Sequence, residues 1–275
     1  MKPKVNKFPV LVSILFCMLA KNLFGFPHNN SAVKDSDTIT VGKMEFVFIP
    51  SGNFIMGSPN SEEHRYNNEN PLHPISIKNF FMMTTEVTQE MWVEVMGENP
   101  SMFNHPHHPV EGVSWYDVKD FIQRMNVRYP MYRFRLPSES EWEYACRAGT
   151  TTPFNTGLTI DSDQANFDGT YAYGKGWRGV SRGSTLPVKS FLPNSWGLYE
   201  MHGNVREWVE DNDHLSYNGA PDDGSAWIYP LSDYKILRGG SWYNYAGNCR
   251  SATRGRLNPS YRQYDNGFRL VLEYQ

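Results

Sequence analysis

The stretch "RGGSWYNYAGNCRSATRGRLNPSYRQYDNGFRLV" spans residues 238–271, and its two ends differ in character from its middle. The RGGSW and GFRL ends combine glycine with large apolar residues, and both predict strands that frame the segment. Between them, residues 243–265 are rich in Tyr, Asn, Ser and Arg and follow no helical or strand period. This composition is typical of a binding surface, in which Tyr gives contact area at low entropy cost and small polar residues adapt to the ligand.

The whole chain has the composition of a loop-rich globular protein. Its 275 residues include 22 Gly and 18 Pro, which are distributed along the sequence, and 15% of the residues are aromatic. This length suits one large domain or two small ones. The formal net charge is −3 and no basic run is present, so we expect no nucleic-acid partner.

The N-terminus is predicted to be a signal peptide over residues 1–25. Lys2, Lys4 and Lys7 precede an apolar run at 8–20. That run is shorter than the roughly 20 residues that a membrane-spanning helix needs, and it suits the core of a signal peptide. We therefore expect an exported protein.

Cys17 offers a lipoprotein alternative, because an apolar run that ends in Cys can be a lipid-attachment site. Bulky Phe16 argues against lipidation, since a small residue is usual there. We expect the protein at the cell surface or as an outer-membrane-anchored lipoprotein, and otherwise in the periplasm or secreted. A lipid anchor would be its one attachment to a membrane. Residues 26–41 are predicted to be a linker, followed by a domain at 42–275.

Helix and strand signals are confined to the two ends of that domain. Three short helices are predicted after the capping residues Thr88, Ser114 and Ser138, with Gly97 ending the first and Gly149 the third. Strands are predicted at 44–50, 51–58, 75–88, 234–242 and 267–274. Residues 150–233 are predicted to be loops.

The cysteines of the mature chain would be Cys146 and Cys249, with Cys17 as well if it is lipidated. They leave one disulfide or two free thiols open, but two cysteines do not make a disulfide scaffold. Cys146 falls in the core of a predicted helix, which favours a buried free thiol.

Six blocks of sequence carry a resemblance to a known family. They are "FVFIPSGNFIMGS" (46–58), "TTEVTQEMWVEVMGENPS" (84–101), "PVEGVSWYDVKDF" (109–121), "RFRLPSESEWEYACRAGT" (133–150), "NSWGLYEMHGNVREWVED" (194–211) and "ILRGGSW…NCRSATR…NGFRLV" (236–271). In this order they resemble the formylglycine-generating, or sulfatase-modifying factor, family. The resemblance implies an α+β fold over 42–274. It is a loop-rich variant of the C-type lectin-like fold, with its terminal strands close together.

The same resemblance implies how an oxidase of the family would work, and where this chain departs from it. The oxidases place two cysteines after the GGS segment to bind Cu(I), a soft ion suited to thiolates. Here the first position is Asn244, and Cys249 meets the second only on an ungapped count. We therefore expect no copper and no catalytic residue. Cys249 is interpreted as a small buried apolar residue, with a lone reactive thiol as the alternative.

The family's structural calcium sites are implied by hard oxygen ligands. The first site would use Glu200 and Glu207 through carboxylates and Gly203 and Val205 through carbonyls, and the second Asn166 and Phe167. The alternative is that these acids cap turns or pair with Arg206 or Arg254.

The predicted binding segment also resembles the C-terminal variable region of surface proteins with this fold that retroelements diversify, as in a treponemal variable protein. The predicted ligand-binding residues are Trp242, Tyr243, Asn244, Tyr245, Gly247, Asn248, Thr253, Gly255, Leu257, Ser260, Tyr261, Gln263, Tyr264 and Asp265. Arg254, Arg256 and Arg262 are interpreted as guanidinium forks for carboxylates or for stacking on aromatic rings.

The function that follows is a non-catalytic, ligand-binding surface protein. Its partner would be a protein or a glycan on a host or neighbouring cell, and the chain is expected to be a monomer. Two alternatives stay open: a formylglycine-generating oxidase or related modifying enzyme, and a structural component of the cell envelope.

Overall fold

The computed structural model describes residues 38–275, and its helices form where the capping residues predict. They are α1 (Gln89–Met96), α2 (Trp115–Arg128) and α3 (Glu139–Arg147). Thr88 caps α1 by accepting a hydrogen bond from Met91 N, and Gly97 ends it at φ +93°. Ser114 and Ser138 each form a capping box with the acid three residues later.

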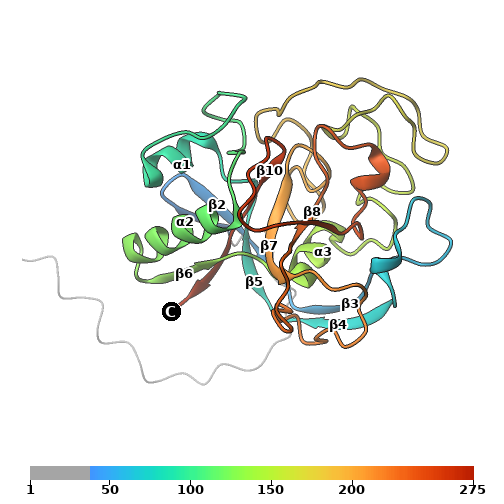
Figure 1. Ribbon diagram of the computed structural model, residues 1–275, viewed down its shortest axis with the longest axis horizontal. Coiled ribbons are helices and arrows are strands. Elements are labelled where there is room, and N and C mark those ends of the chain that lie inside the picture. The colour runs from blue at the N-terminus through green and yellow to red at the C-terminus, as the bar shows by residue number, and fades with distance from the viewer. Residues whose placement is uncertain (1–37) are drawn as a thin grey trace, which may run out of the picture. The chain divides into compact units, whose positions relative to one another are not determined.

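The strands form three sheets (Figure 1). The five-stranded sheet has the order β1-β2-β5-β11-β6, the four-stranded sheet β10-β7-β8-β9, and β3 and β4 pair alone. Their bounds are β1 Thr38–Val41, β2 Met44–Ile49, β3 Gly52–Met56, β4 His73–Ile77, β5 Phe80–Met83, β6 Tyr132–Arg135, β7 Arg206–Asn212, β8 Lys235–Arg238, β9 Gly255–Leu257, β10 Asn266–Gly267 and β11 Val271–Tyr274. Strand β11 pairs with β5, so the last strand lies among the first ones, as the family resemblance implies.

Three sequence-based boundaries need correction. Residues 38–41, predicted as the end of a linker, form β1 and pair with β2. The single strand predicted at 75–88 is two strands in different sheets, β4 and β5. Strand β7, at 206–212, lies inside the region predicted as loops. Its sequence REWVEDN lacks an apolar alternation because its polar residues are largely buried and paired.

The core is aromatic where the helices meet the sheets. Trp92 of α1 stacks on Phe121 of α2 with ring centroids 5.3 Å apart, and the edge of Phe268 meets both rings. Trp142 of α3 is fully buried in a second cluster. Phe268 belongs to the GFRL end of the opening stretch, so this end is anchored in the main core.

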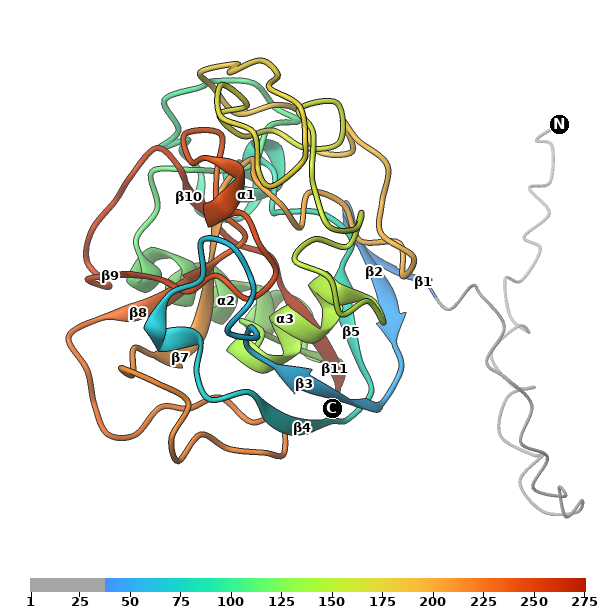
Figure 2. The same ribbon diagram turned by 90° about the vertical axis from the view of Figure 1, so that its right-hand side faces the viewer.

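The loop-rich half of the domain lies on the side opposite α1 and α2 (Figure 1). Two 3₁₀ turns occur here, η1 (Asn67–Glu69) and η2 (Ala246–Asn248). Figure 2 shows η2 between the yellow loops of residues 150–195 and the cyan segment that carries η1.

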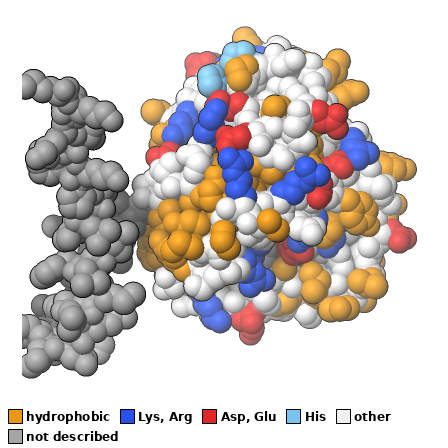
Figure 3. Space-filling model, turned by 90° about the vertical axis from the view of Figure 1, so that its left-hand side faces the viewer, with side chains coloured by type: hydrophobic (Ala, Val, Ile, Leu, Met, Phe, Trp, Pro, Cys, Tyr) orange, Lys and Arg blue, Asp and Glu red, His pale blue; other side chains and the backbone are white. Residues whose placement is uncertain are grey.

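Charges of both signs are interspersed on the face that carries α1 and α2 (Figure 3). Histidine side chains gather at the upper edge of this view, and no large area of one sign is visible there. In residues 38–275, no helix is long and apolar enough to cross a membrane.

Candidate ligand-binding face

Four tyrosines of the predicted binding segment point into solvent. The exposed fractions are 70% for Tyr243, 47% for Tyr245, 58% for Tyr261 and 54% for Tyr264. They fall in two stretches, 242–248 and 255–265, which we call the binding face. Since Tyr exposes a rigid amphipathic ring with few rotatable bonds, this arrangement suits contact with a macromolecular ligand.

The middle of the predicted binding segment is buried and supports the fold instead of facing solvent. Residues 249–254 are all buried. Arg254 uses its guanidinium fork within the chain: it binds the Glu139 carboxylate at 2.7 Å and lies over the Tyr217 ring. Thr253, predicted to bind ligand, is 7% exposed, and its hydroxyl donates to Gly247 O. The segment is therefore two exposed stretches joined by a buried one.

Both ends of the segment are fixed by buried arginines. Arg238 pairs with Glu143, and it also donates to the carbonyls of Ser251 and Thr253. At the other end, Arg269 binds both carboxylate oxygens of Glu207 at 2.7 and 2.8 Å. Buried charges persist when they are paired and fully hydrogen-bonded, so these pairs hold the ends in one position.

Trp242 lies at the junction of the two exposed stretches. Its Nε1 donates to Tyr264 O at 3.1 Å, and its ring meets the edge of Phe103. Nearby, the Ser241 hydroxyl lies 3.1 Å from Asp265 Oδ2 and 3.0 Å from Asn244 Oδ1, and it donates its single proton to one of these acceptors at a time. These bonds join the start of the segment to its end, so the tyrosines of both stretches share one scaffold.

The C-terminal stretch is supported by β7 and by its own turn. Arg206 donates to Gln263 Oε1 at 2.7 Å and to Asp265 Oδ1 at 2.9 Å. Ser260 closes a turn on Asn258, and Gly255 and Leu257 belong to β9. Arg262, which was predicted to be a fork, is exposed and pairs with Asp117.

A second loop adds to the binding face and was missed from the sequence. Asp168 N donates to Asn244 O at 2.8 Å, and the Tyr171 ring meets Tyr245 edge-on at 4.8 Å. In the same loop, Trp177 is 81% exposed. The aromatic run "TYAYGKGW" (170–177) was the available signal, but nothing in the sequence placed it beside residue 245.

A third loop supports the face through Glu111. Phe103 N donates to Glu111 Oε1 at 2.8 Å, and Gly112 N donates to Gln263 O. Glu111 Oε2 is buried and has no hydrogen-bond partner among the described residues. Burial raises the pKa of Glu111 to about 7 from its usual 4.5, and the negative charge of Asp265 adds to the rise.

This carboxyl makes stability depend on pH. The folded state holds the Glu111 proton more tightly than the unfolded chain, so its stabilising contribution is complete below about pH 4.5 and is lost as the pH rises through about 7. Glu111→Gln keeps a neutral side chain. Between about pH 5 and 8, the wild type should lose about 1–3 kcal/mol of unfolding free energy more than the variant does. Urea unfolding measures this, and parallel pH profiles would contradict it.

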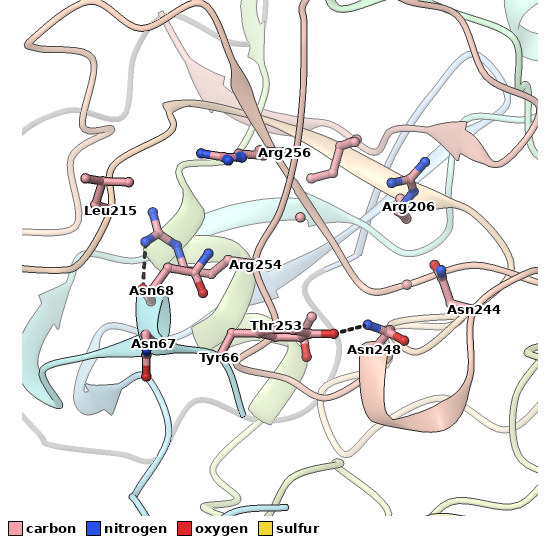
Figure 4. A pocket seen from close by; sticks show the side chains of 13 residues that line it. Tyr66, Asn67, Asn68, Arg206, Leu215, Asn244, Asn248, Thr253, Arg254 and Arg256 are labelled. Carbon is pink, nitrogen blue, oxygen red and sulfur yellow. Dashed lines mark hydrogen bonds between the residues drawn. The ribbon is translucent and has the colours of Figure 1, made fainter. Parts of the chain in front are cut away.

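A pocket of about 550 Å³ lies at the edge of the binding face, between η1 and η2 (Figure 4). It is lined by Tyr66, Asn67, Asn68, Arg206, Leu215, Leu237, Gly240, Asn244, Asn248, Thr253, Arg254, Gly255 and Arg256. Four of these residues, Asn244, Asn248, Thr253 and Gly255, are among the predicted ligand-binding residues. The wall from η1 was not predicted.

Both described cysteines are free and buried. Burial raises the pKa of the Cys249 thiol to about 12, and its Sγ faces Tyr245 O at 3.6 Å. It packs in the cluster of Phe154, Phe167 and Ala246, as expected for a small buried apolar residue. Burial also raises the pKa of Cys146 to about 12, in α3. Neither thiol has the exposed, electropositive surroundings of a reactive cysteine.

The first predicted calcium site is largely satisfied by protein groups. Both oxygens of Glu207 receive hydrogen bonds from Arg269, and Trp142 Nε1 donates to one of them. Glu200 accepts from the backbone N–H groups of Lys189 and Ser190, and burial raises its pKa to about 7. Gly203 has φ +87°, and a Cβ atom added there would lie 2.3 Å from Asn166 O, so a side chain would clash.

Some oxygen atoms in this region could still act as ligands to a hard cation. Glu86 Oε2 and Asn166 Oδ1 are buried and have no hydrogen-bond partner among residues 38–275. Asn204 joins them by bonding to Glu86 Oε1 and to Asn166 Nδ2. The described residues contain no group of three or more His, Cys, Asp or Glu that could hold a metal ion. Calcium binding, through Asn166 and Phe167 or through the first site, stays a prediction.

Comparison with known proteins agrees with this fold. The chain matches the model of the sulfatase-modifying factor enzyme 1-like domain over residues 32–274. Among solved structures, it is similar to PvdO from Pseudomonas aeruginosa, with 33% identity, a TM-score of 0.73, and coverage of 83% of this chain and 94% of that one. It is also similar to Treponema denticola variable protein 1, with 28% identity, a TM-score of 0.68, and coverage of 85% and 97%.

A curated relative is the serine/threonine-protein kinase pkn1 of Chlamydia caviae, 31% identical over 256 residues. The match covers 82% of this chain but 38% of that protein, so the chain spans about two-fifths of the relative's length. The six sequence blocks, the loop-rich α+β architecture and the domain match agree. The chain belongs to the sulfatase-modifying factor, or formylglycine-generating enzyme, family and has its variant of the C-type lectin-like fold.

Proposed function

We propose that this chain is an exported, non-catalytic protein that binds a ligand through the binding face. The observation that carries the proposal is the exposure of Tyr243, Tyr245, Tyr261 and Tyr264 on a segment whose ends and middle are held by buried ion pairs. A rigid support lowers the entropy lost on binding, which favours affinity without new contacts. The similarity to Treponema denticola variable protein 1 supports the proposal that this surface can vary.

The ligand we propose is a protein or a glycan on a host or neighbouring cell, bound by a monomeric chain. Export rests on the signal-like residues 1–25. These residues, and the lipidation candidate Cys17, lie outside the described part of the chain. A structural role in the cell envelope is the alternative that needs no ligand, and binding by the exposed tyrosines would separate the two.

Diversification by a retroelement is part of the proposal, and the burial pattern supports an expectation of where variation would be tolerated. Residues 249–254 are buried and hold ion pairs, so we expect variation at exposed positions such as 243, 245, 261 and 264. A neighbouring reverse transcriptase gene, together with an imperfect repeat of the last coding stretch, would support this.

The rival function is oxidation of a peptide cysteine to formylglycine, with Cu(I) held by two thiolates. In this chain Asn244 replaces the first thiol, and Cys249 is fully buried with a raised pKa. A neutral amide is a poor ligand for Cu(I), and a buried thiol of high pKa is not available as a thiolate. We expect the chain to lack this activity.

A turnover assay tests this expectation. The purified protein, loaded with Cu(I), is incubated with oxygen, a thiol reductant that supplies the two further electrons, and a peptide that contains a sulfatase-type cysteine motif, and formylglycine is measured by mass spectrometry. We expect no product above the buffer blank, and the same result for Cys249→Ser. Turnover in the wild type that disappears in Cys249→Ser would establish the enzyme and overturn the proposal.

A further inference from the structure

The pocket between η1 and η2 is lined by side-chain amides from two separate parts of the chain. Asn67 and Asn68 belong to η1, whereas Asn244 and Asn248 belong to the first stretch of the binding face. Figure 4 shows Asn67 and Asn68 on one side of the pocket and Asn244 and Asn248 on the other. Each amide offers two N–H donors and an accepting oxygen, so the lining can satisfy groups that donate and accept at once.

Part of this hydrogen-bonding capacity is unused. Asn68 Oδ1 and Arg206 Nε are buried and have no hydrogen-bond partner among residues 38–275. Both atoms are closed off from solvent, so a ligand in the pocket reaches them only if these side chains shift, whereas the exposed amide of Asn67 can meet a ligand directly.

The charges around the pocket are paired. Arg206 binds Asp265 at 2.9 Å, Arg254 binds Glu139 at 2.7 Å, and Arg256 binds Asp213 at 2.7 Å. Each guanidinium is thus matched by a carboxylate of this chain. The pocket therefore offers no uncompensated arginine among the described residues, and this argues against a phosphate, sulfate or carboxylate ligand.

The rim adds apolar contact area. Leu215 is 84% exposed and Tyr66 is 48% exposed, and both line the pocket. Tyr66 is held in place because its hydroxyl accepts a hydrogen bond from Asn248 Nδ2 at 2.9 Å. This bond joins the two walls, so the pocket is formed before the ligand arrives. Its volume of about 550 Å³ lies within the range of roughly 300–1,000 Å³ typical of small-molecule sites.

We infer that this pocket binds an uncharged sugar unit of the ligand, and hence that the binding face recognises a neutral glycan. Sugar hydroxyls donate and accept in several directions, as the four amides do, and the C–H faces of a sugar ring suit Tyr66 and Leu215. This inference rests on the proposed ligand-binding function and names the ligand class.

The test uses the full mature protein on an array of neutral, sialylated and sulfated oligosaccharides, followed by titration of the best neutral probe. Asn248→Asp keeps the shape of the side chain but replaces two donors with a charge. Asn67→Ala removes an exposed amide from the opposite wall. Asn218→Asp, at an exposed position outside the pocket, is the matched control.

The expected result is binding to neutral oligosaccharides that weakens at least about fivefold in Asn248→Asp and in Asn67→Ala but not in Asn218→Asp. Thermal unfolding checks that the variants are folded. Binding confined to sialylated or sulfated probes, or unchanged in both pocket variants, overturns the inference.

A peptide library screened in parallel distinguishes a failure of the sugar pocket from a failure of the proposed ligand-binding function. Peptide binding that is lost in Tyr243→Ala, with no glycan bound, overturns the sugar pocket but leaves the proposed function standing.

Discussion

Replacing Arg250 with methionine is expected to lower the free energy of unfolding by about 3–5 kcal/mol. Arg250 is fully buried, and its guanidinium binds both oxygens of Glu69 at 2.6 and 2.9 Å. It also pairs with Glu62 and donates to the carbonyls of His64 and Gly247. Methionine fills similar space but leaves two buried carboxylates without a compensating charge. This loss should also loosen η1, because Glu69 is its last residue.

Arg256→Met is the matched control, since Arg256 lies in the same segment but on its surface. Its side chain is 55% exposed and pairs with Asp213. Exposed pairs contribute about 0–1 kcal/mol, so the control should change stability by less than about 1 kcal/mol. Urea unfolding of the three proteins measures both effects. Equal unfolding free energies for the two variants would show that the buried middle of the segment, residues 249–254, does not support the fold as described above.

Replacing Gly240 with alanine should cost about 2–5 kcal/mol. Gly240 lies in the RGGSW end at φ +72°, where a side chain is strained. A Cβ atom would also lie 2.4 Å from Cys249 Sγ and 2.9 Å from Asn248 O. The backbone of η2 would have to move to relieve this overlap. Both the RGGSW end of the segment and the η2 wall of the pocket would then be displaced.

Gly219→Ala is the control that separates the cost of the steric overlap from the cost of the positive φ angle. Gly219 has φ +84°, but no atom lies within 4 Å of its added Cβ. It should therefore lose only the backbone term of about 1–2 kcal/mol. Thermal or urea unfolding compares the two variants. If Gly240→Ala were no more destabilising than Gly219→Ala, the close approach between the RGGSW end and Cys249 would not constrain the fold.

The helices could be predicted from the sequence because their signals are local. Thr88, Ser114 and Ser138 each act on backbone groups within three residues, so a short window contains the whole interaction. Strand β7 could not be predicted in this way. Its Glu207 is buried against Arg269, which lies 62 residues later in the chain. The sequence alone does not distinguish a buried, paired glutamate from one exposed to solvent.

The binding face shows the same limit. The four exposed tyrosines follow from composition, but the burial of Arg250 and Arg254 does not. Glu69, the partner of Arg250, lies 181 residues earlier in the chain. Arg254 pairs with Glu139, 115 residues away, and so resembles a surface arginine in the sequence. Only the fold brings the η1 wall of the pocket and the loop of Tyr171 beside the segment.

The central claim is that the exposed tyrosines of the binding face carry recognition. The most direct test measures binding of the wild type and of a Tyr243/Tyr245/Tyr264→Ala triple variant to the same displayed peptides and glycans. A second triple variant, Tyr116/Tyr229/Tyr274→Ala, removes tyrosines that are 57%, 69% and 64% exposed elsewhere on the domain. We predict that binding is lost in the first variant and retained in the second. Equal binding by the wild type and the first variant would contradict the claim.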